Sequence, residues 1–181
     1  MNSRILIPLC ASALLFGGCS NANKPNAENF TKTINAWFQD RPDCLFPGGR
    51  RFPYEVAPGK GAKEAKQQMD SLMTAGLLKR LEDLDLHVDS YTLTPAGNRA
   101  APAFCYGYRQ VTQIDGFTPP APRNGFNETD VSYHYQMLNV PVWAKTDEVI
   151  KAFPQLAKDL GDSPSDKITL ATVGAGWQVP H

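Results

Sequence analysis

The side chains able to do acid–base, metal or nucleophilic chemistry are few and widely spaced in this chain. Histidine stands at three positions: His87, His134 and His181. None is at metal-ligand spacing from another histidine or a cysteine, which is the pattern that a zinc site needs. The Gly-x-Ser-x-Gly motif, which marks a serine nucleophile on a strand–helix turn, is absent. These observations predict no catalytic site, no metal and no cofactor.

An acidic cluster and two glycine-rich segments carry no recognisable chemistry either. The acidic residues lack the regular oxygen spacing and the central glycine of a calcium loop. We interpret them as a solvated turn: Glu82, Asp83, Asp85 and Asp89. Segments 47–49 and 174–176 are interpreted as turns, because neither opens a helix as a phosphate-binding loop does. The enzymatic alternative is a small envelope hydrolase whose site is assembled from His134, Glu128 and Asp130.

The first nineteen residues predict where the protein works. A basic tip ends at Arg4, and an apolar run of twelve residues, 5–16, follows it. This order is typical of a secretory signal, and the run is shorter than the roughly 20 residues that span a bilayer. The ending Leu-Phe-Gly-Gly-Cys resembles the lipobox of bacterial lipoproteins, with Phe16 where that family usually has leucine. The resemblance implies a signal peptide at 1–18 and lipidation of Cys19 with acyl chains such as palmitate.

The same resemblance implies a location. Ser20, and not aspartate, follows Cys19, which in this family favours the periplasmic face of the outer membrane. Cleavage after residue 18 leaves 163 of the 181 residues, enough for one domain, over which we expect 30–181 to fold. Residues 19–29 contain no apolar side chain larger than alanine after the cysteine and predict a flexible tether. The mature chain has 17 basic and 18 acidic side chains, a balance that gives polyanion binding no support.

Cysteine usage fits an oxidising compartment. Cys10 leaves with the signal and Cys19 is acylated, so Cys44 and Cys105 remain. We predict that they form a disulfide, with two separately buried thiols as the alternative. Closing a loop of about 60 residues removes denatured-chain entropy worth about 4 kcal/mol.

Residues 30–101 predict two helices and a small sheet. Apolar spacing indicates a helix over 29–39 and a second over 62–75, with Gly76 as its left-handed C-cap. Short strands are expected at 52–56 and on both sides of the acidic turn. Thr94 followed by Pro95 predicts a helix cap and a first helical position.

Within this half, residues 62–99 resemble a known family. A helix ending in Ala-Gly-Leu-Leu, a charged hairpin and a closing Tyr-Thr-Leu-Thr-Pro-Ala-Gly are similar to the recognition helix and wing of MarR-type winged-helix proteins. The resemblance implies a winged-helix-like half. Nucleic-acid binding is only a second alternative, because the wing is acidic, the expected preceding helix is missing, and affinity for phosphates needs cations. We interpret the nearby basic run as a solvated face: Arg50, Arg51, Lys60, Lys63 and Lys66.

Residues 102–181 predict an antiparallel sheet with a packed helix, so the whole domain is α+β. Apolar residues alternate over 104–108 and 131–137, which indicates two paired strands joined by a long surface loop, 117–130. A helix is expected from Thr146, divided by Pro154, and a hairpin over 168–179 closes the chain.

The aromatic residues of this half provide the one signal for binding. Tyrosines 106, 108, 133 and 135 with Trp143 suit either a packed core, which we favour, or a partner surface. We expect a non-enzymatic envelope lipoprotein that binds a protein partner, as an assembly partner or as a toxin-immunity type of inhibitor. The predicted contact residues are Phe117 and Phe126 in the surface loop and Trp143 at its rim.

Overall fold

The computed structural model describes residues 22–83, 85, 87–174 and 176–180. The predicted signal peptide 1–18, Cys19 and His181 lie outside the described residues. The fold is a mixed α+β arrangement of two antiparallel sheets and short helices, as expected. Among the described residues, no helix is long and apolar enough to cross a membrane.

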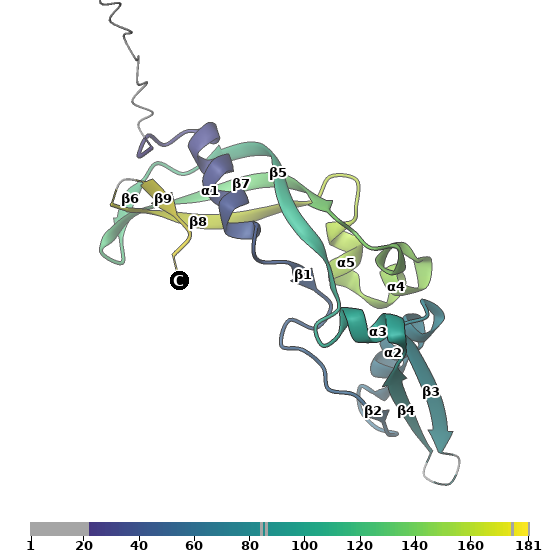
Figure 1. Cartoon of the computed structure of the whole chain (residues 1–181). Coiled ribbons are helices and arrows are strands. Elements are labelled where there is room, and N and C mark those ends of the chain that lie inside the picture. The colour runs from purple at the N-terminus through teal and green to yellow at the C-terminus, as the bar shows by residue number, and fades with distance from the viewer. Residues whose placement is uncertain (1–21, 84, 86, 175, 181) are drawn as a thin grey trace, which may run out of the picture.

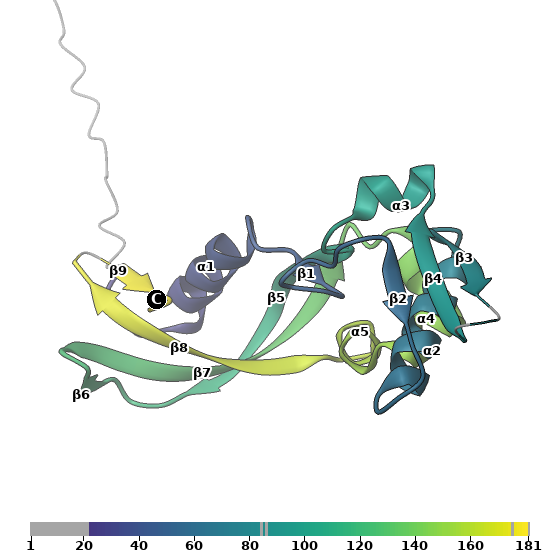
Figure 2. The ribbon, with the colours of Figure 1, turned by 90° about the horizontal axis from the view of Figure 1, so that it is seen from below.

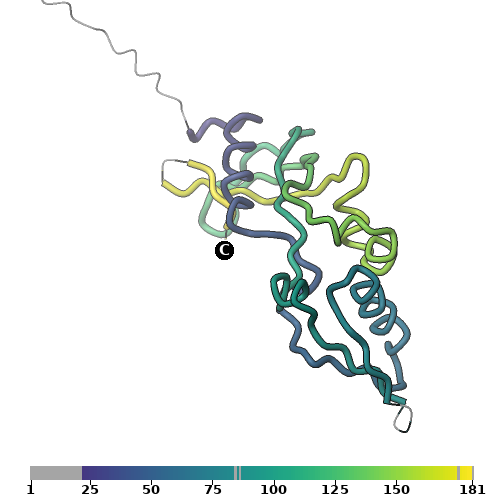
Figure 3. Tube along the Cα trace, turned by 45° about the vertical axis from the view of Figure 1, so that its right-hand side comes forward, coloured from purple at the N-terminus to yellow at the C-terminus, as the bar shows by residue number. Residues whose placement is uncertain are grey.

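The helices are α1 (Ala27–Phe38), α2 (Ala62–Thr74), α3 (Pro95–Ala100), α4 (Asp147–Ala152) and α5 (Pro154–Asp159), with a 3-10 turn η1 at Val142–Lys145. The strands are β1 (Asp43–Cys44), β2 (Tyr54–Val56), β3 (Leu78–Asp83), β4 (Val88–Leu93), β5 (Cys105–Phe117), β6 (Ala121–Arg123), β7 (Phe126–Leu138), β8 (Ser165–Val173) and β9 (Gly176–Gln178). Figures 1 and 3 show α1 and β9 at one end of the molecule and α2, β3 and β4 at the other.

The larger sheet has the order β1-β5-β7-β8-β9, with β6 paired to β7, and it curls around α1 (Figure 2). Val131, Tyr133 and Tyr135 of β7 are buried, whereas the residues between them are half-buried on the opposite face. The predicted alternation and the antiparallel pairing of β5 with β7 are therefore confirmed. The tyrosines of β7 are core side chains and do not form a partner patch.

Helix α1 lies between the two edges of this curled sheet. Phe30 and Ile34 are fully buried against the sheet. On one edge the Val111 amide donates to Asn35 Oδ1 at 2.8 Å, and on the other Thr33 Oγ1 donates to the Trp177 carbonyl at 3.4 Å. Side chains of α1 thus bond to the strand edges, which would otherwise present unpaired backbone groups.

The start of α1 differs from the prediction. Asn26 is the N-cap, and its side chain accepts a hydrogen bond from the Asn29 amide at 2.8 Å. Residues 27–29 are consequently helical, although the sequence analysis assigned them to the tether 19–29. Asparagine is a favourable N-cap residue, and two positions of this segment carry one, so residue type alone did not fix the start.

The prediction of a long surface loop over 117–130 was wrong. Strand β5 extends to Phe117, β7 begins at Phe126, and β6 pairs with β7. Asn124 and Gly125 both have positive φ, 51° and 83°, which is the geometry of a two-residue type I′ hairpin turn. Pro122 stands in β6, which pairs on one side only, so the missing amide of proline is tolerated.

The smaller sheet has the order β2-β4-β3 and packs with α2 around a second core. Gly76 follows α2 with a φ of 76°, and Thr94 caps α3 by accepting from the Gly97 amide at 3.0 Å, with Pro95 in the first turn. These three local predictions are confirmed. The acidic residues were not all solvated as predicted, because Asp89 lies in β4 and pairs with Lys66 and Arg80.

The two cores do not follow the predicted division into residues 30–101 and 102–181. Helix α1 packs in the core of the large sheet, whereas Val149 and Ala152 of α4 belong to the core around α2. The helix that covers the large sheet is therefore α1, and not the helix predicted from Thr146. Pro154 does divide that helix into α4 and α5. We call the two units the sheet core and the α2 core.

Candidate functional site

The two cores meet where β1, β5 and α5 converge, and a covalent bond closes this junction. Cys44 of β1 and Cys105 of β5 form the predicted disulfide across a sequence separation of 61 residues. The two cysteines are also partners in the antiparallel register of β1 and β5. The bond therefore links the loop after α1 to the start of the strand that runs through both cores.

A buried carboxylate lies at the same junction. Asp159 of α5 is 1% exposed, and its oxygens accept from Tyr106 and Tyr135 hydroxyls at 2.6 Å each and from Gln155 Nε2 at 2.8 Å. Burial, and then the hydrogen bond to Asp159, raise the pKa of both tyrosines well above the usual range. Tyr106 belongs to the α2 core and Tyr135 to the sheet core, so this carboxylate connects the two.

Arg109 is the cation that balances this junction. Its Nε and Nη2 donate to the Asp43 oxygens at 3.0 and 3.1 Å, and its Nη1 donates to Asp166 at 2.8 Å. Asp159 lies 3.5 Å away, so three carboxylates share one guanidinium. Burial raises the pKa of Asp43 in spite of the nearby Arg109, and Asp159 and Asp166 add to that rise. Because these groups satisfy one another, we interpret the cluster as structural.

A surface furrow runs beside this junction. One hollow, of about 550 Å³, is lined by Leu77, Arg99 and Trp143, and a neighbouring one, of about 500 Å³, lies against α1. Both are lined by Tyr108 and Asn139, so they form one continuous surface, which we call the junction furrow.

The rim of the junction furrow carries an exposed apolar residue. Val142 is 84% exposed, the highest value among the large hydrophobic side chains that the structure describes. Next to it, Trp143 is half-buried and packs its ring edge-on against Phe104, with centroids 6.3 Å apart. A rigid aromatic beside an exposed valine is typical of a partner-binding surface.

The structure does not bring the three predicted contact residues together. Phe117 is 41% exposed, and its ring packs on Phe30 at 4.9 Å. Phe126 is 47% exposed and lies at the start of β7. Both are near β6, and Figure 1 places β6 and α4, which follows Trp143, at opposite ends of the molecule. Only Trp143 lines the junction furrow.

The predicted hydrolase residues are not assembled either. Glu128 and Asp130 both pair with Arg123, at 3.2 and 3.1 Å. The His134 ring instead contacts Ser163 Oγ through Nδ1 at 3.0 Å and Asp115 Oδ2 through Nε2 at 3.3 Å.

Sequence reasoning missed Asp115 and Ser163 as neighbours of His134. The strand register pairs Gln113 with His134 and so makes Asp115 a diagonal neighbour, but a bulge in β5 hides this relation from the sequence. His134 and Asp115 are each 34% exposed and Ser163 is exposed, so water is not excluded from the group. Low-dielectric stabilisation of a developing charge, a main source of catalysis, is therefore weak at this place.

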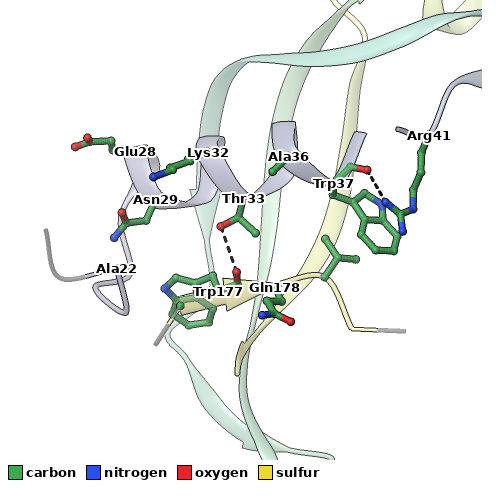
Figure 4. A pocket seen from close by; sticks show the side chains of 12 residues that line it. Ala22, Glu28, Asn29, Lys32, Thr33, Ala36, Trp37, Arg41, Trp177 and Gln178 are labelled. Carbon is green, nitrogen blue, oxygen red and sulfur yellow. Dashed lines mark hydrogen bonds between the residues drawn. The ribbon is translucent and has the colours of Figure 1, made fainter. Parts of the chain in front are cut away.

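A third surface hollow follows α1 on its side toward β9 (Figure 4). This groove, which we call the α1–β9 groove, has a volume of about 670 Å³. Ala22, the first described residue, lies at one end, and Trp177 of β9 forms part of its wall. Lys32 is exposed along α1, and Arg41 holds its guanidinium 3.6 Å above the Trp37 ring.

Within the part of the chain that the structure describes, no three histidine, cysteine or acidic residues come together as ligands for a metal ion. Comparison of the chain with protein-family models, with curated proteins and with solved structures found no match. The functional argument therefore depends on the geometry of the surfaces described above.

Proposed function

We propose that this protein is a lipid-anchored envelope protein that binds a protein partner and does not turn over a substrate. The observation that carries the proposal is the Val142–Trp143 rim of the junction furrow. Interface hot spots favour tryptophan in well-packed pockets with a polar surround, and Tyr108 and Arg99 supply that surround here. A partner seated in the furrow contacts both cores, as an assembly partner or an inhibitor would.

The anchor is part of the same proposal. The lipobox-like ending before Cys19 supports lipidation, and Ser20 supports retention at the periplasmic face of the outer membrane. A Cys19→Ser variant should fail to mature and should leave the membrane fraction, since several acyl chains are needed for stable anchoring. Recovery of unmodified wild-type protein from the soluble periplasm would contradict the anchor.

We propose, further, that the α2 unit is winged-helix-like and serves protein contact. The strand order β2-β4-β3, with α2 between β2 and β3, supports this arrangement, and α4 packs on α2 as the helix missing from the sequence before it. Nucleic-acid contact is disfavoured because the cations near the wing are occupied. Arg80 lies 3.0 Å from Asp70, and Lys66 pairs with Asp70 and Asp89.

Site-specific photocrosslinking tests the binding surface. A photoreactive residue at Val142 should trap one discrete protein in the native envelope, and the matched probe at Phe126, an exposed aromatic at the other end, should not. Adding Arg99→Glu should weaken the Val142 adduct, because the charge on the furrow wall is reversed. An adduct at Phe126 alone would move the interface to the sheet end. No adduct at either position would end the proposal for both surfaces.

One observation favours a second candidate function. The Ser163–His134–Asp115 contacts have the order of a nucleophile, a base and an orienting acid. If the group hydrolyses esters, both Ser163→Ala and His134→Ala should abolish turnover of a p-nitrophenyl ester by the purified protein. Equal turnover in wild type and both variants would remove this candidate.

A further inference from the structure

The α1–β9 groove lies next to the residue that we propose as the lipid anchor. Ala22 lines the groove, and Cys19 is three residues earlier in the sequence. An extended chain spans at most about 3.6 Å per residue, so Cys19 is within about 11 Å of Ala22. The inference rests on the proposed anchor at this point, because a lipidated Cys19 holds this end of the molecule against the bilayer surface.

The groove carries cations suited to an anionic membrane surface. Lys32 and Arg41 are exposed along its length, and Glu28 is its one acidic lining residue. Arg41 donates to the Trp37 carbonyl at 3.0 Å while it stacks over the Trp37 ring, so its position is fixed on α1. Juxtamembrane cations attract anionic headgroups, and tryptophan favours the headgroup region.

The wall of the groove also contains an unused hydrogen-bond donor. Trp177 is 6% exposed and packs edge-on against Phe30, with centroids 5.1 Å apart. Its indole Nε1 is buried and has no hydrogen-bond partner among the described residues. Figure 4 shows this nitrogen on the side of the ring nearest Ala22. A buried donor without an acceptor is unfavourable, and an ester or phosphate oxygen in the groove would satisfy it.

We propose that the α1–β9 groove binds headgroups of anionic phospholipids in the membrane that holds the Cys19 anchor. The phosphates meet Lys32 and Arg41, and the glycerol ester region meets Trp37 and the Trp177 indole. The protein then lies with α1 and β9 on the bilayer, and the α2 core projects away from it. This orientation leaves the junction furrow free for a partner.

Quenching by brominated phospholipids tests the groove with internal controls. The purified lipidated protein is placed in vesicles of brominated phosphatidylglycerol and phosphatidylcholine, and tryptophan fluorescence is recorded. Trp37→Phe should lower the quenched fraction, whereas Trp143→Phe should raise it, because Trp143 belongs to the distant α2 core. Equal quenched fractions in the two variants would overturn the proposal.

Charge reversal separates headgroup binding from simple proximity. Lys32→Glu with Arg41→Glu should reduce quenching at least twofold in the anionic vesicles, and the matched pair Lys145→Glu with Lys151→Glu, both exposed at the α2 end, should not. Millimolar inorganic phosphate should leave wild-type quenching unchanged, since the ligand is a membrane headgroup and not the free anion. Quenching that is equal in purely phosphatidylcholine vesicles, or removed by free phosphate, would contradict the proposal.

Flotation of the same vesicles distinguishes the two proposals. If the wild-type protein does not float with vesicles, the anchor fails and the groove proposal fails with it. If it floats but Trp37 is quenched no more than Trp143, the anchor stands and the groove proposal alone is wrong.

Discussion

Single residues decide whether the two cores act as one body, and Asp159 is the clearest case. Asp159→Ala leaves the buried Tyr106 and Tyr135 hydroxyls without their acceptor and removes one of the carboxylates near Arg109. We expect the free energy of unfolding to fall by about 3–5 kcal/mol. Urea unfolding measures it, with Asp162→Ala as the matched control, because that aspartate is exposed. A loss as small as that of the control would mean that the tyrosines find other partners.

The pH dependence of stability should carry a signature of Asp43. Burial raises the pKa of Asp43 above its ordinary value of 3.8, so between 3.8 and the raised pKa the folded state binds more protons than the unfolded state. This contribution to stability is fully present below pH 3.8 and is lost as the pH rises through the folded pKa. Asp43→Asn lacks this loss.

The measurement for Asp43 is urea unfolding of wild type and Asp43→Asn from pH 3.5 to 7. The stability of the variant relative to wild type should increase with pH across this range. A relative stability that decreases with pH would show that Arg109 outweighs burial and lowers the pKa of Asp43.

At the scale of elements, α3 is fixed by a close contact with the strand that follows α2. A Cβ on Gly97 would lie 2.0 Å from the Leu77 carbonyl oxygen, which also accepts from the Thr94 amide at 3.0 Å. Alanine normally favours a helix over glycine by about 1 kcal/mol, but here α3 must move away. We expect Gly97→Ala to cost about 1–3 kcal/mol.

Thermal and urea unfolding test this prediction with a matched substitution elsewhere. Gly116→Ala is the control, because a Cβ there meets no atom within 4 Å and its φ is not left-handed. The control should be nearly neutral. If Gly97→Ala were equally neutral, the close packing of α3 on Leu77 would be incorrect.

Local signals in the sequence predicted local structure well. The alternation over 131–137, the glycine after α2 and the Thr94–Pro95 pair each depend on neighbouring residues, and each was found. The Asn124-Gly125 turn was also legible, but the surrounding prolines favoured a loop. Packing of α4 on α2 could not be predicted, because it joins segments far apart in the chain.

The candidate sites show the same limit. The junction furrow gathers Leu77, Arg99 and Trp143, which have no common motif, so only its tryptophan was anticipated. The Asp159 cluster did leave one signal. Asp159 stands three residues after the buried Leu156, on the apolar face of its helix, where an acidic side chain requires a buried partner.

For the whole molecule, the arrangement separates three surfaces along one long axis. The α1–β9 groove is at the end next to Ala22, the junction furrow is between the cores, and the β3–β4 hairpin is at the far end (Figures 1 and 3). An anchored protein of this shape holds its furrow away from the bilayer. Forces on a bound partner then pass through the junction, so the connection between the cores matters for function.

The Cys44–Cys105 disulfide should therefore couple the stability of both cores. Cys44→Ala with Cys105→Ala opens a loop of about 60 residues, which the chain-entropy model values at about 4 kcal/mol. Since β5 runs through the junction and Asp159 bonds to both cores, neither core should unfold alone after this loss. Hydrogen exchange during urea unfolding, read at β4 and at β8, should give two midpoints that fall together. Midpoints that separate in the variant would show that the disulfide, and not the buried carboxylate cluster, makes the cores cooperative.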